Sequence, residues 1–187
     1  MHLTLTSGLR QEEALGLRWR DVDTSGGLIR VRQAHGRHGI TELKTRAARR
    51  EIGLEPEAAR LLAAHRLASR HSDEDDLVFA TADGKALGHR RVLRVVERAR
   101  AASGLDAKCE AQGARRLTFH GLRHAYGSLR IANGDAPADV SRAMGHADAT
   151  VTLRVYAHEI EKARRLERER ESIAVTFDGL GAVGEVP

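Results

Sequence analysis

Three short β-prone runs lie close together near the start of this chain, and most of the chain after them has helical spacing. The runs are "GGLIRVRQAH" (26–35), "GITELKTR" (39–46) and "RREIGL" (49–54), separated by "GRHG" and by a basic turn. Short runs of this kind predict a small antiparallel sheet. From Pro56 the apolar residues recur with helical spacing, and another helix is expected from His89 to Ala102. We therefore expect an α+β fold that is mostly helical, with one small antiparallel three-stranded sheet.

The remaining segments before residue 120 have weaker signals. A polar start at Thr6 and Ser7 predicts one short helix that ends near Trp19. The segment "AKCEAQGARR" (107–116) is expected to be a loop that joins the two halves of the domain. On the helix expected at residues 89–102, four apolar residues should face inward: Val92, Val95, Val96 and Ala99.

The C-terminal segment has a different character from the rest. A strongly charged helix is expected from about Glu159, followed by "IAVTF" (173–177), whose apolar residues alternate as in a strand. Such a strand would need a partner edge, so we expect it to add to the small sheet at residues 28–54. The last ten residues, "DGLGAVGEVP", are rich in glycine and predict a frayed end.

The composition favours a polyanionic partner. The 187 residues include 31 Lys and Arg against 26 Asp and Glu, a formal net charge of +5, which favours nucleic acid. A basic surface that only keeps the chain in solution is the alternative. The single cysteine, Cys109, excludes an internal disulfide and a cysteine metal cluster, and it fits a cytoplasmic location. No apolar run is long enough for a signal peptide or a membrane span, so no membrane partner is expected.

The segment "HGLRHAYGSLRIANG" (120–134) carries a basic and an apolar face if it is helical. The basic face holds His120, Arg123, His124 and Gly127, and we expect it to be exposed. The opposite face holds Leu122, Ala125, Leu129 and Ala132. Tyr126 lies on the flank of the apolar side, which predicts a packed core tyrosine.

The two histidines of this segment allow a second interpretation. His120 and His124 are four residues apart, the spacing of a helical zinc pair. The glutamate of the H-E-x-x-H pattern is absent because Gly121 stands in its place, and no cysteine or acidic ligand lies nearby. A zinc hydrolase therefore stays only as an alternative, and no metal is expected.

The segment "MGHADATVTLRVYAH" (144–158) predicts a junction between two helices. Gly145 can end the first helix, Asp148 can cap the second, and His146 lies between them. Taken alone, His146 would be a polar turn residue and Tyr156 an aromatic residue on a helix surface.

Together, three segments resemble the signature boxes of the tyrosine recombinase (phage integrase) family. They are "TSGLRQEEALGLRW", "HGLRH" and "MGHADATVTLRVYAH", in that order, with a lysine in the β-prone region between the first two. By this resemblance the catalytic residues are Arg10, Lys44, His120, Arg123, His146 and Tyr156. Glu13 follows Arg10 by three positions and can hold it in an ion pair. We assign His124 a supporting role.

Cleavage of a phosphodiester requires the same types of residue. Cleavage by an oxygen nucleophile places negative charge on the nonbridging oxygens, and the planar guanidiniums of Arg10 and Arg123 can donate to them in pairs. Tyrosine has a reference pKa of about 10, so Tyr156 needs a base, for which we expect His120. Lys44 is the expected acid for the leaving 5′ oxygen. No cofactor is expected, because the phosphotyrosyl bond retains the energy of the phosphodiester.

The basic turn after Lys44 carries further arginines. A turn that only touches the DNA backbone would look the same, and Arg46, Arg49 and Arg50 are expected to contact phosphates.

The resemblance also implies an organisation and a function. Residues 1–160 are expected to form a tyrosine recombinase catalytic domain and residues 161–187 a C-terminal helix and tail, with the family's N-terminal core-binding domain absent. The implied function is site-specific cleavage and rejoining of double-stranded DNA through a covalent 3′-phosphotyrosyl intermediate. Other recombinase protomers on DNA, in a tetrameric synapse, are the expected partners. The alternative is a non-catalytic or inactive DNA-binding fragment of an integrase.

Overall fold

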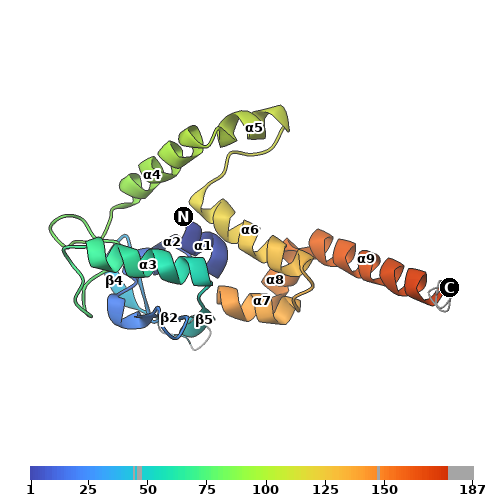
Figure 1. Cartoon of the computed structure of the whole chain (residues 1–187), viewed down its shortest axis with the longest axis horizontal. Helices are drawn as coiled ribbons and strands as arrows, with labels where there is room; N and C mark the ends of the chain where they lie inside the picture. The colour runs from blue at the N-terminus through green and yellow to red at the C-terminus, as the bar shows by residue number, and fades with distance from the viewer. Residues whose placement is uncertain (44, 46–47, 147, 177–187) are drawn as a thin grey trace, which may run out of the picture.

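The computed structural model describes residues 1–43, 45, 48–146 and 148–176. Its helices are α1 (His2–Ser7), α2 (Gln11–Gly16), the 3-10 helix η1 (Trp19–Asp21), α3 (Pro56–Ala68), α4 (His89–Ala102), α5 (Leu105–Ala111), α6 (Phe119–Ala132), α7 (Pro137–Met144), α8 (Ala149–Val155) and α9 (Ala157–Thr176). The strands are β1 (Val22–Asp23), β2 (Leu28–Val31), β3 (Gln33–Gly36), β4 (Gly39–Glu42) and β5 (Arg50–Gly53). Figure 1 shows a helical body from which the α4–α5 segment and α9 project. The expected α+β class with a small antiparallel sheet is confirmed.

The three-stranded antiparallel sheet has the order β1-β2-β5, and its register places Ile29 opposite Ile52. The strands β3 and β4 form a separate antiparallel pair. The run predicted as one strand at 26–35 is therefore divided between the two sheets. The division follows from packing against α2, because the buried Gln33 amide donates to the carbonyl of Gly16 at 2.6 Å.

The N-terminal segment forms two short helices, so the prediction of one helix from Ser7 to Trp19 was wrong. Gly8, with a φ of 66°, ends α1 in the left-handed conformation, and its backbone N–H bonds to the carbonyl of Thr4. The Ser7 hydroxyl bonds back to Leu3 instead of capping the next helix. A side chain at position 8 would overlap the ring of Tyr126. The break therefore brings the start of α2 against α6.

Two clusters of buried residues form the core. The first joins α1, α2, α3 and the three-stranded sheet, and Trp19, Ile29 and Leu62 are among its members. The second lies among α6, α7 and the junction of α8 with α9, and it includes Tyr126 and Tyr156. The candidate site lies where elements of the two clusters meet.

The segment after residue 88 departs from the sequence prediction in two places. The helix at 89–102 is confirmed as α4, with Val92 and Val96 buried, but Val95 is 50% exposed. The expected loop at 107–116 is wrong for its first half, which belongs to α5. There Arg100 holds Asp106, on the first turn of α5, at 3.1 Å.

The helix α9 continues to Thr176, so the strand expected at 173–177 is wrong for residues 173–176, and Phe177 lies outside the described residues. Ile160 packs into the second cluster, whereas the described side chains after it are exposed. Because α9 lies against α6 and α8, it does not extend the sheet. None of the helices in the described part of the chain is long and apolar enough to cross a membrane.

Candidate active site

Arg10 stands at the N-cap of α2, where Glu13 holds it in two ways. The Glu13 carboxylate accepts the backbone N–H of Arg10 at 2.8 Å and its Nη1 at 2.7 Å. The Nη2 atom donates to the carbonyl of Gly145 at 2.9 Å. The expected ion pair between Arg10 and Glu13 is thus present. The Arg10 side chain is 40% exposed, so its outer edge remains open to a ligand.

The same carboxylate binds Arg50 from β5, and both side chains are buried. Arg50 donates twice to Glu13, and its remaining bonds go to the carbonyls of Ala143 and Ala48. Burial raises the pKa of Glu13, but the hydrogen bonds and charge of Arg50 and then of Arg10 outweigh it, and the pKa lies below its ordinary value. The expectation that Arg50 contacts DNA phosphates is corrected, because its guanidinium is used inside the protein.

Arg123 comes from α6. The N-cap of this helix is Thr118, whose hydroxyl accepts the N–H of Gly121 at 2.9 Å. The arginine is 3% exposed, and its Nη1 donates to the carbonyl of Gly8 at 2.6 Å. Its Nη2 is buried and has no hydrogen-bond partner among the described residues. Burial, and then the charge of Arg10, lowers the pKa of Arg123 to about 10, which leaves it charged at neutral pH. A charged donor held in this way is ready to bind an anion.

The burial of α6 differs from the sequence prediction. His120 is exposed and Leu122 is buried, as predicted, but Arg123 and Gly127 on the basic face are buried and Leu129 on the apolar face is 56% exposed. The amphipathic pattern is misleading here because the site itself is covered by α1 and by Tyr156. Tyr126 is 5% exposed and packed, as predicted.

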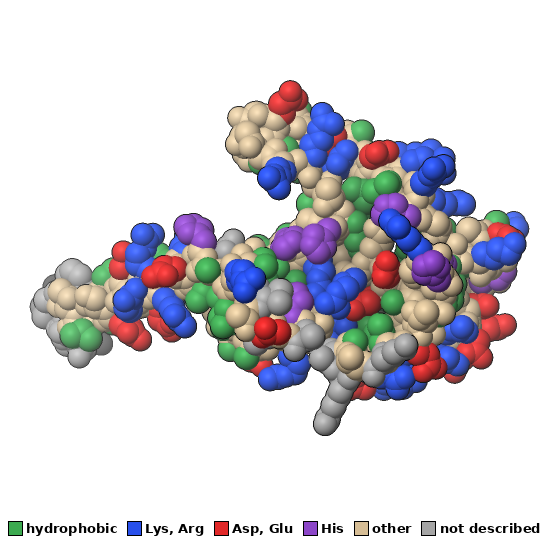
Figure 2. All heavy atoms as spheres, turned by 180° about the vertical axis from the view of Figure 1, so that it is seen from behind, with side chains coloured by type: hydrophobic (Ala, Val, Ile, Leu, Met, Phe, Trp, Pro, Cys, Tyr) green, Lys and Arg blue, Asp and Glu red, His purple; other side chains and the backbone are tan. Residues whose placement is uncertain are grey.

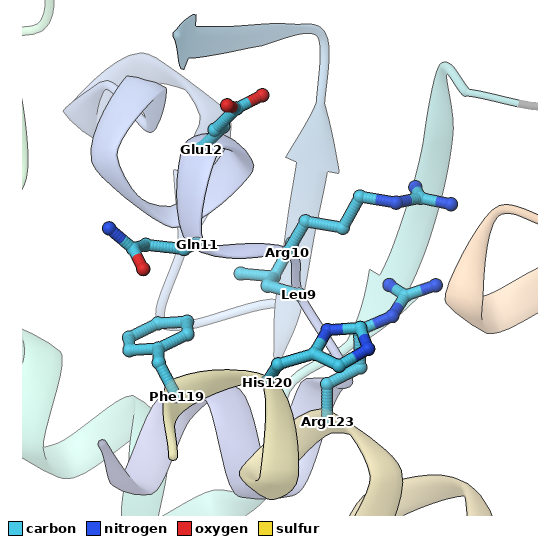
Figure 3. Close-up of a pocket in the computed structure, with 7 residues that line it drawn as sticks. All are labelled: Leu9, Arg10, Gln11, Glu12, Phe119, His120 and Arg123. Carbon is cyan, nitrogen blue, oxygen red and sulfur yellow. The ribbon is translucent and has the colours of Figure 1, made fainter. Parts of the chain in front are cut away.

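A pocket of about 260 Å³ opens between α2 and α6. It is lined by Leu9, Arg10, Gln11, Glu12, Phe119, His120 and Arg123. Figure 3 shows the guanidiniums of Arg10 and Arg123 pointing the same way from their two elements, with the His120 ring beside them. Two arginines and an imidazole at one pocket form a site for a tetrahedral oxyanion such as phosphate.

His120 and His124 stack edge to face, with their ring centroids 4.5 Å apart. Burial, and then the charges of His124, Arg123 and Arg10, keep the pKa of His120 below its ordinary value. His120 is therefore neutral at physiological pH and can accept a proton. The described residues contain no group of three or more histidine, cysteine or acidic side chains placed to hold a metal ion.

His146 lies between α7 and α8, as the sequence predicted, after Gly145 (φ 66°) and before the N-cap Asp148. Its Nδ1 lies 2.6 Å from the hydroxyl of Thr152. Burial, followed by the charges of Arg123, Arg10 and other nearby cations, lowers the pKa of His146 to about 4. The imidazole is therefore neutral at pH 7.

Tyr156 caps the C-terminus of α8 and is 2% exposed, in contrast to the surface position that its local sequence suggested. Its hydroxyl lies 3.4 Å from Nδ1 of His124 and 3.8 Å from the sulfur of Met144. Gly127 makes room for the ring, because a Cβ at that position would overlap the phenol. The aromatic ring thus lies against α6 beside the arginine site.

The basic turn is described only in part. Lys44 and Arg46 lie outside the described residues, whereas Arg49 is half exposed and bonds to Glu42 and to the carbonyl of Leu43. The structure therefore brings together five of the six predicted catalytic residues and both supporting residues: Arg10, His120, Arg123, His146, Tyr156, Glu13 and His124.

The molecule is thus a mostly helical α+β domain with a cationic pocket next to a buried tyrosine. A model of the phage integrase family matches residues 1–163. The chain belongs to the phage integrase family.

Individual relatives agree with this assignment. The chain is 31% identical over 196 residues to an integrase of Streptomyces ambofaciens, covering 95% of this chain and 47% of that protein. It is 24% identical over 186 residues to a XerC-like tyrosine recombinase of Caldanaerobacter subterraneus subsp. tengcongensis, covering 87% and 45%. The chain therefore spans about half the length of the curated relatives it matches.

Solved structures show the same fold. The Tn1549 transposon integrase in complex with circular intermediate DNA matches with a TM-score of 0.69 and 24% identity, over 90% of this chain and 57% of that one. The XerA recombinase matches with a TM-score of 0.66 and 20% identity, over 90% and 56%.

Two contacts that build the site were not predicted from the sequence. Arg50 bonds to Ala143, which is far away in the sequence, and Thr152 contacts His146 across a turn. Helical spacing indicates neither contact. A weak signal existed for Thr152, since it lies four residues before Tyr156 and so on the same side of a helix.

Proposed function

We propose that the chain is the catalytic domain of a site-specific DNA recombinase, which cleaves and rejoins double-stranded DNA through a covalent 3′-phosphotyrosyl intermediate on Tyr156. The observation that carries the proposal is the pocket where Arg10 and Arg123 lie together, with a buried N–H of Arg123 that has no partner among the described residues. Arg10 is held by Glu13 and the carbonyl of Gly145 and is 40% exposed, whereas Arg123 is held by the carbonyl of Gly8 and is buried at the wall of the pocket. A scissile phosphate would accept hydrogen bonds from both.

The chemical step needs a base and an acid besides the arginines. The Tyr156 oxygen attacks phosphorus while its proton passes to His120, and the bond to the 5′ oxygen breaks. That oxygen takes a proton from Lys44, a role that rests on the family resemblance alone. His146 donates to the phosphate, and His124 supports Tyr156 through the 3.4 Å contact with its hydroxyl.

The burial of Tyr156 sets a condition on this reaction. Because the ring is 2% exposed within the second cluster, the hydroxyl has to move towards the pocket when DNA binds. Tyr156 stands at the junction of α8 and α9, where the backbone is not helical. A change in its backbone angles would move the ring without unfolding either helix.

The DNA on either side of the scissile phosphate would lie along α4. His89 at the start of α4 lies 2.8 Å from the amide of Gln11, which lines the pocket, so this helix begins at the rim of the site. Four exposed arginines of α4 have no ion-pair partner among the described residues: Arg90, Arg91, Arg94 and Arg98. In the view of Figure 2, histidine and basic side chains gather at the centre of the molecule, and further basic side chains lie on the projecting α4–α5 segment. Arg49 would add a phosphate contact, as would Arg46 by the sequence argument.

The organisation of the protein is part of the proposal. Residues 1–160 would act as the catalytic domain and 161–187 as a C-terminal helix and tail, with α9 crossing that boundary. Further recombinase protomers on DNA would be the partners. A cytoplasmic location fits a DNA substrate and the single cysteine, Cys109, which is free in the structure.

The proposal is tested by covalent capture. The chain would be incubated with a library of nicked duplexes of randomised sequence, in which the short strand released by cleavage diffuses away and traps the protein on DNA. We expect a covalent adduct on a denaturing gel for the wild-type chain. Tyr156→Phe should abolish it, because the attacking oxygen is lost. EDTA should leave it unchanged.

The matched control for this test is Tyr126→Phe, which removes the other tyrosine hydroxyl of the second cluster. That hydroxyl accepts a hydrogen bond from Arg130 at 2.7 Å, so the substitution costs about 1 kcal/mol of stability but keeps the adduct. An adduct that depends on Tyr126 and not on Tyr156 would refute the nucleophile assignment.

The buried Tyr156 favours a second candidate function, a module that holds DNA without cleaving it. In that case the library would bind reversibly and no adduct would form with any variant. Loss of reversible binding in Arg123→Ala would then still identify the pocket as the DNA site.

A further inference from the structure

Thr152 contacts both His146 and the backbone of Tyr156. The side chain lies in α8 and is fully buried. Its hydroxyl oxygen lies 2.6 Å from Nδ1 of His146. Its carbonyl accepts the backbone N–H of Tyr156 at 2.9 Å. Thr152 thus connects His146, the proposed hydrogen-bond donor to the phosphate, with Tyr156, the proposed nucleophile.

The contact with the hydroxyl matters because His146 is neutral. The charged and titratable groups around it are Arg123 and His124 on α6, Arg10 at the start of α2 and Arg50 on β5. Burial, followed by the charges of Arg123, Arg10 and Arg50, lowers the pKa of His146 to about 4. A neutral imidazole carries a single N–H, either on Nδ1 or on Nε2, and the partner of one nitrogen decides which.

The two tautomers would do opposite things to a phosphate. If the Thr152 hydroxyl donates to Nδ1, the proton of the ring is on Nε2, which makes no hydrogen bond to the described residues and is left to donate. If Nδ1 donates to the hydroxyl oxygen, Nε2 presents a lone pair, which repels a phosphate oxygen. A site that binds an anion needs the first arrangement.

We propose that Thr152 is a positioning residue of the strand-cleavage reaction, whose hydroxyl donates to Nδ1 of His146 and holds the ring with Nε2–H directed to the scissile phosphate. This inference rests on the proposed function. The carbonyl of Thr152 also accepts the backbone N–H of Tyr156, so the residue that orients His146 also holds the end of α8 from which the nucleophile extends.

Two substitutions separate the hydroxyl from its packing. Thr152→Val keeps the shape and the branched Cβ but removes the donor, whereas Thr152→Ser keeps the donor and removes a methyl group. The tautomer of His146 is read by long-range proton–nitrogen NMR on the ¹⁵N-histidine-labelled chain without DNA, with the signal assigned by its loss in His146→Gln. Adduct formation is then measured with the nicked library.

The wild-type chain and Thr152→Ser should show the Nε2–H tautomer, and Thr152→Val a shift towards a mixture. Thr152→Val should slow adduct formation by about 10- to 100-fold, because the His146 ring is no longer held in the orientation that donates to the phosphate. Thr152→Ser keeps the hydroxyl and should stay close to the wild type. Urea unfolding would show that both variants fold.

Three outcomes would overturn the proposal. They are an Nδ1–H tautomer in the wild-type chain, an unchanged tautomer and rate in Thr152→Val, or an equal loss in folded Thr152→Ser, which would mean that packing and not the hydroxyl matters. Because the NMR measurement uses DNA-free protein, it is independent of cleavage. Absence of a wild-type adduct together with the expected tautomers would instead refute the proposed function.

Discussion

At the scale of single residues, the buried Glu13 holds the arginine side chains of the site in place. It is 2% exposed and accepts hydrogen bonds from Arg10, which faces the pocket, and from Arg50, which is buried. A buried carboxylate between two guanidiniums needs both partners, because an uncompensated buried charge is costly. The precise placement of Arg10 therefore depends on a residue that never touches the phosphate.

Arg50→Ala should destabilise the chain by about 3–5 kcal/mol, since it leaves Glu13 buried with Arg10 as its remaining cation. Arg49→Ala is the matched control, because the neighbouring side chain is 54% exposed and pairs with an exposed glutamate. It should change stability by less than about 0.5 kcal/mol. Urea unfolding measures both. Equal effects would contradict the internal role of Arg50.

Acid should weaken the fold through His146. Its folded pKa of about 4 lies below the ordinary value of 6.5, so the unfolded chain takes up the proton first. The free energy of unfolding should therefore fall as the pH drops from 6.5 towards 4, and His120, whose pKa is also lowered, contributes in the same direction.

His146→Gln should reduce this acid-induced loss of stability, measured as the difference in unfolding free energy between pH 7 and pH 5. His38→Gln, on the exposed turn between β3 and β4, is the control. If His146→Gln loses as much stability between the two pH values as the wild type, the depressed pKa is not a property of the fold.

At the scale of elements, α6 serves two purposes along one face. Its first two turns carry His120 and Arg123 to the pocket, and its next turn carries Gly127, on which the ring of Tyr156 lies. Glycine is a poor helix former, and at this position its missing Cβ leaves the space for the tyrosine.

Gly127→Ala should destabilise the chain by about 1–2 kcal/mol. The added methyl group overlaps the phenol of Tyr156, and this overpacking outweighs the gain of about 1 kcal/mol in helix propensity. Gly121→Ala, in the first turn of the same helix, is the control, since a Cβ there meets its nearest neighbour, Leu117, at 3.3 Å. It should be neutral or stabilising. A stabilising Gly127→Ala would show that the ring of Tyr156 leaves its place freely.

At the scale of the whole molecule, the site lies where two cores meet, and the basic helix α4 stands apart from both. α1 and the sheet belong to the first cluster, and Tyr156 belongs to the second. Arg10 and Arg123 approach from the two sides. Figure 1 shows that α4 and α5 project from this body, so the arginines of α4 can follow a duplex that lies over the pocket.

The affinity for DNA should fall steeply with salt, and α4 should account for part of the slope. Each neutralised phosphate contributes about 0.9 to the slope of log K against log salt. The double variant Arg91→Ala with Arg94→Ala should lower the slope by up to about 1.8. Fluorescence anisotropy of a labelled 30-base-pair duplex (a length of about three helical turns) between about 50 and 200 mM salt measures it.

The control for α4 is Arg60→Ala, because Arg60 lies on α3 and is already paired with Glu57 at 2.6 Å. It should leave the slope unchanged. An unchanged slope in the α4 double variant would exclude this helix from the DNA surface.

Features that depend on local chemistry could be predicted from the amino-acid sequence alone. The cap at Asp148, the end of α7 at Gly145 and the pair of Arg10 with Glu13 are interactions within a few residues, so spacing predicts them. The family boxes, which are also local, identified the site residues that the fold brings together.

Tertiary structure decided the features that depend on distant contacts. Arg50 looks like any arginine of a basic turn, and only the fold places it against Glu13 and the carbonyl of Ala143. The residues 173–176 alternate like a strand, yet they continue α9, because a helix satisfies its own backbone while a strand needs a neighbouring edge. Burial of Arg123 and Tyr156 likewise follows from how α1, α6 and α8 pack, which no local pattern encodes.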